Sequence, residues 1–124
     1  MFSYENLEVY RKAYQTNQKV YRLLKENKKI MSYTKNQLGR ASLSIMLNIA
    51  EGSAKFSDKD RRNFYITARG SVFECSSLIG FLCAEEEIET EWKEEVCSCY
   101  EEISKMLFIM VRNLEKQNGE SKKT

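Results

Sequence analysis

The sequence contains no proline and no histidine, and it has only five glycines among 124 residues. Proline usually marks loops and sheet edges, so its absence favours a few long elements joined by short turns. Without histidine the chain lacks the commonest general base and the Glu-x-x-His pairs of a di-iron bundle. It also lacks a glycine-rich phosphate loop. These absences argue against a metalloenzyme and leave no evident catalytic group.

Long apolar runs are missing as well. None approaches the ~20 residues needed to span a bilayer, and the N-terminal MFSYENLEVYRK lacks the basic-then-apolar pattern of a signal peptide. Four cysteines without a secretory signal predict reduced thiols, and the Cys97–Cys99 spacing does not suit a zinc knuckle. We therefore expect a cytoplasmic, single-domain protein with no membrane segment, metal or cofactor.

The residues that are abundant favour helix, and their apolar periodicity predicts four helices. These are expected at about 4–27, 34–56, 58–86 and 90–117, with Ser57 capping the third, Gly119 ending the fourth and a flexible tail at 120–124. Tyr14 and Tyr21 fall on the predicted core stripe of the first helix. Helices of matched length with short turns predict an all-α, antiparallel up-down-up-down four-helix bundle.

The second helix is too apolar for a surface helix. Leu38, Ala41, Ile45 and Ile49 form one stripe, while Leu43 and Leu47 cover another side. The third helix is similar, because Phe73 and Phe81 lie away from its main stripe. We expect copies of the chain to share this surplus surface in a homo-oligomer.

Polar residues on the second and third helices are also periodic. If the helices fold back near Ser57, Arg40 would pair with Glu74, Ser44 would face Gly70, and Asn48 and Glu51 would bond nearby groups. The predicted network comprises Arg40, Ser44, Asn48, Glu51, Gly52, Gly70, Ser71 and Glu74. Such an array can be a ligand site, or it can fix helix register and subunit geometry. We favour the structural interpretation, because no tuned acid, base or nucleophile accompanies it.

At these residues the chain resembles a known family. The segment LGRASLSIMLNIAEGSAKFSDKDRRNFYITARGSVFECSSLI, together with YENLEVYRKAY, closely resembles the four-helix-bundle family of 23S rRNA intervening-sequence proteins. That family is similar to the accessory variability protein of diversity-generating retroelements. Two departures are visible: Gly39 stands where a second basic residue often precedes Arg40, and Met46 or Leu47 replaces a proline often found before NIAEG.

The resemblance implies a bundle that assembles into a ring-shaped homopentamer. For the retroelement relatives it also implies binding to a reverse transcriptase and to nucleic acid. It does not imply catalysis.

Charge is unevenly distributed along the chain. Residues 1–72 hold 14 Lys or Arg against 6 Asp or Glu, whereas residues 73–124 hold 6 against 12. The basic positions that could meet a phosphate backbone are Arg11, Lys12, Lys19, Arg22, Lys25, Lys29, Arg61 and Arg62. A solvated basic face, neutralised by the acidic fourth helix, is the alternative.

Two functions follow from these patterns. The preferred one is a non-enzymatic oligomeric scaffold that docks a protein partner, RNA or both through its ring surface. The alternative is a nucleic-acid-binding protein that uses the basic face of its first helix without sequence preference.

Overall fold

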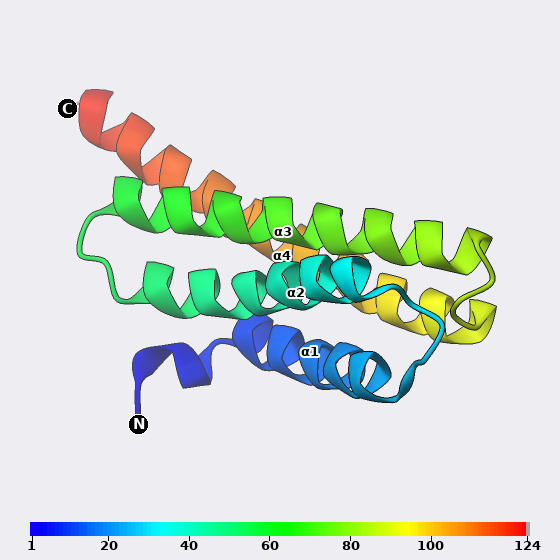
Figure 1. The fold of residues 1–124 in the computed structure, drawn as a ribbon. Coiled ribbons are helices and arrows are strands. Elements are labelled where there is room, and N and C mark those ends of the chain that lie inside the picture. The colour runs from blue at the N-terminus through cyan, green and yellow to red at the C-terminus, as the bar shows by residue number, and fades with distance from the viewer. Residues whose placement is uncertain (124) are drawn as a thin grey trace.

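The computed structural model describes the backbone of residues 1–123 and the side chains of residues 1–117. Within these residues the chain is all-α and has no strands (Figure 1). The elements are a short 3-10 helix η1 (Ser3–Asn6) and four α-helices: α1 (Glu8–Glu26), α2 (Ser32–Ser53), α3 (Asp58–Ala84) and α4 (Thr90–Lys123).

The helix ends differ most from the predicted ones in two places, while the ends of α2 and α3 lie within three residues of the predicted 34–56 and 58–86. Leu7 is extended and separates η1 from α1, so the predicted first helix is broken near its start. At the other end, α4 continues through Gly119 to Lys123, and Thr124 lies outside the described residues. A glycine costs a helix only ~1 kcal/mol relative to alanine, which is not enough to end a long helix by itself.

Local side chains define the turns between the helices. Ser57 caps α3 as the sequence predicted, because its Oγ accepts a hydrogen bond from Asp60 N at 3.1 Å. In the α1–α2 turn, Asn27 Oδ1 accepts from Lys29 N and Ile30 N at 2.8 and 2.9 Å. Asn27 Nδ2 also donates to Glu87 O at 2.7 Å, which ties this turn to the α3–α4 turn.

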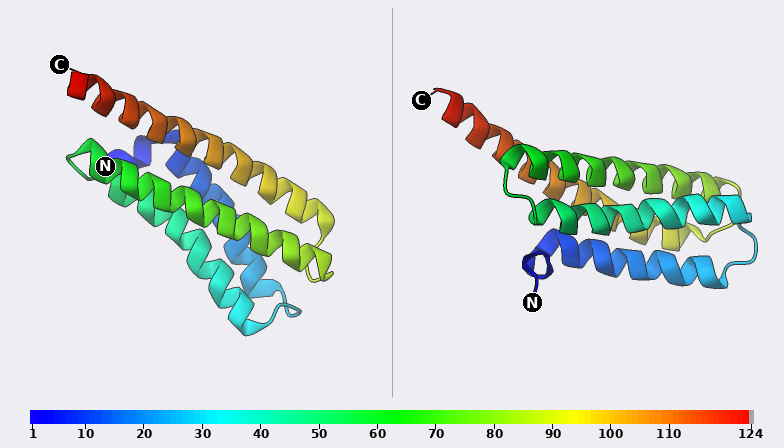
Figure 2. Two further views of the ribbon diagram at one scale, coloured as in Figure 1. Left: turned by 90° about the horizontal axis from the view of Figure 1, so that it is seen from above. Right: turned by 60° about the vertical axis from the view of Figure 1, so that its left-hand side comes forward.

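The helices lie side by side, with α4 projecting beyond the others at the C-terminal end (Figure 2). Helix α1 contacts α2 and α4, and α3 contacts the same two helices. In the described part of the chain no contacts join α1 to α3 or α2 to α4, so these pairs are diagonal. The α1–α2 face and the α3–α4 face therefore lie on opposite sides of the molecule.

The core contains the predicted apolar stripe of α2 and a row of α4 side chains, but a different stripe of α1 from the predicted one. Leu38 and Ile49 on α2 and Ile103 and Leu107 on α4 are fully buried. On α1 the buried side chains are small: Val9, Ala13, Thr16, Asn17 and Val20. The predicted placement of Tyr14 and Tyr21 in the core is wrong, since they are 47% and 55% exposed. Small residues let α1 approach its neighbours closely, and the tyrosines lie on its flank.

Candidate interaction site

The α2–α3 seam contains a compact cluster of hydroxyl and amide groups. Ser44 Oγ and Ser71 Oγ are 2.9 Å apart and share a hydrogen bond between the two helices. Asn48 Nδ2 donates to Ser44 O at 2.8 Å and to Ser44 Oγ at 2.9 Å. The partner of Ser44 is thus Ser71, one residue beyond the predicted Gly70. These hydrogen bonds stay within and between the two helices, which fits a structural role.

The predicted ion pair between Arg40 and Glu74 is not formed within the described chain. Glu74 Oε2 instead accepts a hydrogen bond from Gln37 Nε2 at 2.5 Å, and Arg40 is exposed. With 3.6 residues per turn, Gln37 lies two turns from Ser44 and is rotated by only ~20°, whereas Arg40 is rotated by ~40°. The residue that faces α3 is therefore Gln37.

Gly52 permits a close approach of α2 to α3. It is buried, and a Cβ at this position would lie 2.8 Å from Tyr65 Cε1 and 3.0 Å from Phe64 Cβ. The side chain of its neighbour Glu51 is exposed and makes no hydrogen bond or ion pair to the described residues. The expectation that Glu51 bonds a nearby group is wrong for the single chain.

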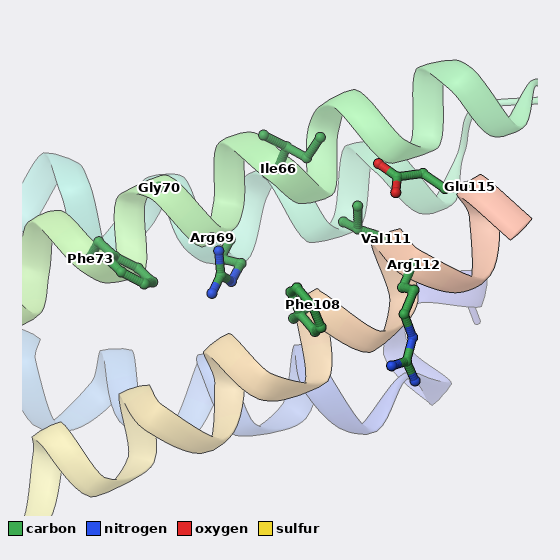
Figure 3. A pocket seen from close by; sticks show the side chains of 8 residues that line it. All are labelled: Ile66, Arg69, Gly70, Phe73, Phe108, Val111, Arg112 and Glu115. Carbon is green, nitrogen blue, oxygen red and sulfur yellow. The ribbon is translucent and has the colours of Figure 1, made fainter.

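A groove that sequence patterns did not identify runs between α3 and α4. Figure 3 shows the residues of this α3–α4 groove, which has a volume of about 510 Å³. They are Ile66, Arg69, Gly70, Phe73, Phe108, Val111, Arg112 and Glu115. A second hollow of about 540 Å³, lined by Ser77, Tyr100 and Ser104 among others, shares Arg69 and Phe73 with it. The two hollows therefore adjoin each other along α3.

Arg69 occupies the centre of the groove, between two phenyl rings (Figure 3). Its guanidinium carbon lies 4.8 Å from the ring centroid of Phe73 and 5.4 Å from that of Phe108. Arg69 Nε is buried and makes no hydrogen bond within the described chain. The rings remain 57% and 50% exposed. Exposed Phe73 was the one sequence signal for this groove, whereas Arg69 carried none.

Some of the predicted basic residues form ion pairs or hydrogen bonds within the chain, and others form no ion pair with the described residues. Lys12 pairs with Glu102, and Lys19 pairs with Glu95 at 2.5 Å across the α1–α4 seam. The hydrogen bond that Lys19 Nζ donates to Glu95 Oε1 is the main reason that the pKa of Lys19 is raised. Acidic α4 therefore neutralises part of the basic face, as the alternative interpretation expected.

Three of the predicted arginines also form an ion pair or hydrogen bonds within the chain. Arg62 pairs with Glu115 at 2.7 Å, and Arg61 Nε donates to Lys55 O at 2.7 Å. Arg11 Nη1 contacts two carbonyl oxygens of η1 at 3.3 and 3.4 Å.

Arg22, Lys25 and Lys29 are exposed and make no ion pair with the described residues. Arg22 and Lys25 line a hollow of about 300 Å³ together with Tyr14 and Tyr21, and Lys25 Nζ lies 4.8 Å from the Tyr21 ring centroid. Arg22 and Lys25 thus lie beside exposed aromatic rings, a combination that sequence analysis missed because it placed the tyrosines in the core.

The cysteines are free thiols. Burial raises the pKa of Cys75 to about 12 and also raises the pKa of Cys97. Among the described residues no group of His, Cys, Asp or Glu side chains could hold a metal ion. No helix in that part of the chain is long and apolar enough to cross a membrane.

Comparison with known proteins agrees with the predicted family. The family model described as 23S rRNA-intervening sequence protein matches residues 5–108. A crystal structure of a protein with unknown function from the S23 ribosomal protein family of Bacteroides thetaiotaomicron is 24% identical and has a TM-score of 0.79. The match covers 83% of this chain and 97% of that chain, and at this identity it shows a shared fold. Among curated proteins, none matches the chain.

Proposed function

The chain belongs to the 23S rRNA-intervening sequence protein family, and we propose that it is the subunit of a homo-oligomeric scaffold with no enzymatic activity. In this proposal each subunit is an antiparallel up-down-up-down bundle, and five copies form a ring that docks a protein partner, RNA or both. A reverse transcriptase is one candidate partner, from the resemblance to the retroelement proteins. We place the scaffold in the cytoplasm, since its cysteines are free thiols.

The observation that carries the proposal is large apolar side chains exposed on two unlike faces. On α2, Leu43 and Leu47 are 40% and 58% exposed. Across the molecule, Phe73, Phe108 and Ile66 line the α3–α4 groove and are about half exposed. Contiguous apolar surface of this kind marks interaction sites. When the two contacting faces differ, association is heterologous and can close into a ring.

A light-scattering measurement of mass tests the assembly. The chain has a mass of 14.6 kDa, and we expect the purified protein to show a multiple of this value that persists on dilution. Five copies would support the ring. A mass of one chain at every concentration would refute the scaffold.

A second function, nucleic-acid binding through α1, is favoured by Arg22 and Lys25 beside exposed Tyr14 and Tyr21. Single-stranded nucleic acid is typically held by cations that follow the backbone and aromatic rings that stack on bases. Because the cations interact with phosphates, affinity should fall steeply as salt increases.

An electrophoretic shift assay with single-stranded RNA at two salt concentrations tests this function. The double variant Arg22→Glu, Lys25→Glu should abolish binding. Lys12→Glu, Lys19→Glu is the matched control, because those lysines already pair with α4 carboxylates, and it should weaken binding less. An equal loss of RNA binding in both variants would show that the overall charge of the protein, and not the surface around Arg22 and Lys25, determines binding.

A further inference from the structure

Resting on the proposed assembly, we infer that the α3–α4 groove of one protomer receives the outer face of α2 of the next protomer. The α2 outer face consists of Leu43, Leu47 and Glu51, which lie on successive turns. In this contact Glu51 pairs with the guanidinium groups of Arg69 and Arg112 of the neighbouring copy. In this contact Glu51 of the NIAEG segment gains a partner that the single chain does not supply.

The groove has no carboxylate that is free to pair with its two arginines. Arg69 is stacked between two phenyl rings, and its Nε makes no hydrogen bond within the described chain. Arg112 lies 6.0 Å from the Phe108 ring centroid and forms no ion pair with the described residues. The groove's one carboxylate, Glu115, pairs with Arg62. A buried donor without an acceptor is unfavourable, so a carboxylate from outside would complete this site.

The α2 outer face has the complementary composition. Leu43 and Leu47 are exposed apolar residues, and Glu51 is an exposed carboxylate one turn further along, with no partner in the described chain. Apolar side chains would cover the exposed rings of the groove, and the carboxylate would meet its cations. The face therefore matches the groove in both polarity and charge.

The spacing of the two surfaces also matches. Leu43, Leu47 and Glu51 follow one another at intervals of four residues on α2, and so do Ser77, Phe73 and Arg69 on α3 in the reverse direction. Each interval is about 6 Å along a helix, so Leu47 can lie against Phe73 while Glu51 reaches Arg69. Both series are ridges of the i±4 type, which interdigitate in the commonest class of helix packing.

Small residues on the α3 side of the groove leave room for the α2 leucines. A Cβ built on Gly70 would meet no atom within 4 Å, so space is open above this part of α3. Leu43 would lie opposite Ser77, which is also small. A large side chain introduced at Gly70 would therefore occupy the groove without disturbing the packing of the subunit.

The α1–α2 hollow is a less suitable partner for the α3–α4 groove than the α2 outer face. The α1–α2 hollow is apolar in part, but it carries Arg22 and Lys25. These cations would meet Arg69 and Arg112, and like charges brought together in an interface are destabilising. The α2 outer face brings a carboxylate, Glu51, in place of these cations.

Light-scattering mass at a fixed protein concentration tests the inference with three variants. Glu51→Arg alters the α2 face, and Gly70→Phe fills the groove. Gly80→Phe is the matched control, because Gly80 is also on α3, also has no atom within 4 Å of a built Cβ, and does not line the groove. We expect Glu51→Arg and Gly70→Phe to reduce the mass to that of one chain and Gly80→Phe to keep the wild-type mass. Far-ultraviolet circular dichroism should be the same for all of them.

A charge-exchange experiment tests the pairing itself. The variant Arg69→Glu, Arg112→Glu should not self-associate, and neither should Glu51→Arg. Mixed in equal amounts, the two should again form species larger than one chain, because every contact between unlike copies joins opposite charges. A ring of five still contains one contact between like copies, so the expected result is association and not the wild-type mass.

The failures of the two proposals are distinguishable. If wild-type protein is a single chain at all concentrations, the scaffold is refuted and the inference falls with it. If the wild type is oligomeric but Glu51→Arg and Gly70→Phe keep its mass, the copies associate through other surfaces and only the inference is wrong. Failure of the mixed variants to associate would equally refute the Glu51–arginine pairing.

Discussion

Replacing Gly52 with alanine should destabilise the chain, although alanine is the better helix former. A Cβ at this position would lie 2.8 Å from Tyr65 Cε1 and 3.0 Å from Phe64 Cβ, well inside normal contact distance. The Phe64 Cβ cannot rotate away because it is fixed to the backbone, and the Tyr65 ring is buried. The added methyl group must therefore push α2 and α3 apart.

The magnitude follows from two opposing effects. Replacing glycine with alanine gains at most ~1 kcal/mol of helix propensity, and less at Gly52 because it is the penultimate residue of α2. Overpacking a tight core contact costs ~1–3 kcal/mol, and two rigid overlaps favour the upper end of that range. We therefore expect Gly52→Ala to lower the free energy of unfolding by about 2 kcal/mol, which for a chain of this length is a melting temperature lower by about 6–8 °C.

Gly80→Ala is the matched control, because nothing lies within 4 Å of a Cβ built on Gly80. It should gain most of the ~1 kcal/mol of helix propensity. Urea unfolding of both variants, followed by circular dichroism at one protein concentration, measures the difference. If both variants are stabilised equally, α2 does not approach α3 as closely at Gly52 as described, and the reasoning fails.

Three other predictions concern single contacts. A double-mutant cycle with Ser44→Ala and Ser71→Ala should give a coupling energy of about 0.5–1.5 kcal/mol by urea unfolding, and additive effects would contradict their hydrogen bond. Raising the pH should destabilise the wild type more than Cys75→Ala, because the buried thiol has a pKa raised from 9.0 to about 12 while the unfolded thiol ionises near 9.0. The difference in free energy of unfolding between the two proteins should grow above pH 9.0 by up to about 1.4 kcal/mol per pH unit. If the free energies of unfolding of both proteins fall in parallel with pH, Cys75 is not buried in this way. Lys19→Ala should change the free energy of unfolding by less than about 1 kcal/mol, since the pair with Glu95 is solvent-exposed, and a larger loss in thermal unfolding would show that it does more than a surface pair.

The sequence by itself determined the helical class, the family and much of the local structure. Helix propensity and apolar periodicity depend on neighbouring residues, so four helices and the buried stripe of α2 could be predicted. The Ser57 cap is equally local, because its acceptor and donor are three residues apart. The partners Ser44 and Ser71 were predicted to within one residue from the position of the turn alone.

Only the tertiary structure decided the rotation of α1 about its axis and the exact partners of individual side chains on α2 and α3. A rotation of a few tens of degrees turns Tyr14 and Tyr21 outward, selects Gln37 over Arg40 as the partner of Glu74, and places Arg69 between two phenyl rings. Periodicity specifies which residues share a stripe, but it does not specify which of two adjacent stripes packs best against another helix. That choice depends on side-chain volumes contributed by segments far apart in the sequence, and it arises only when the helices pack together.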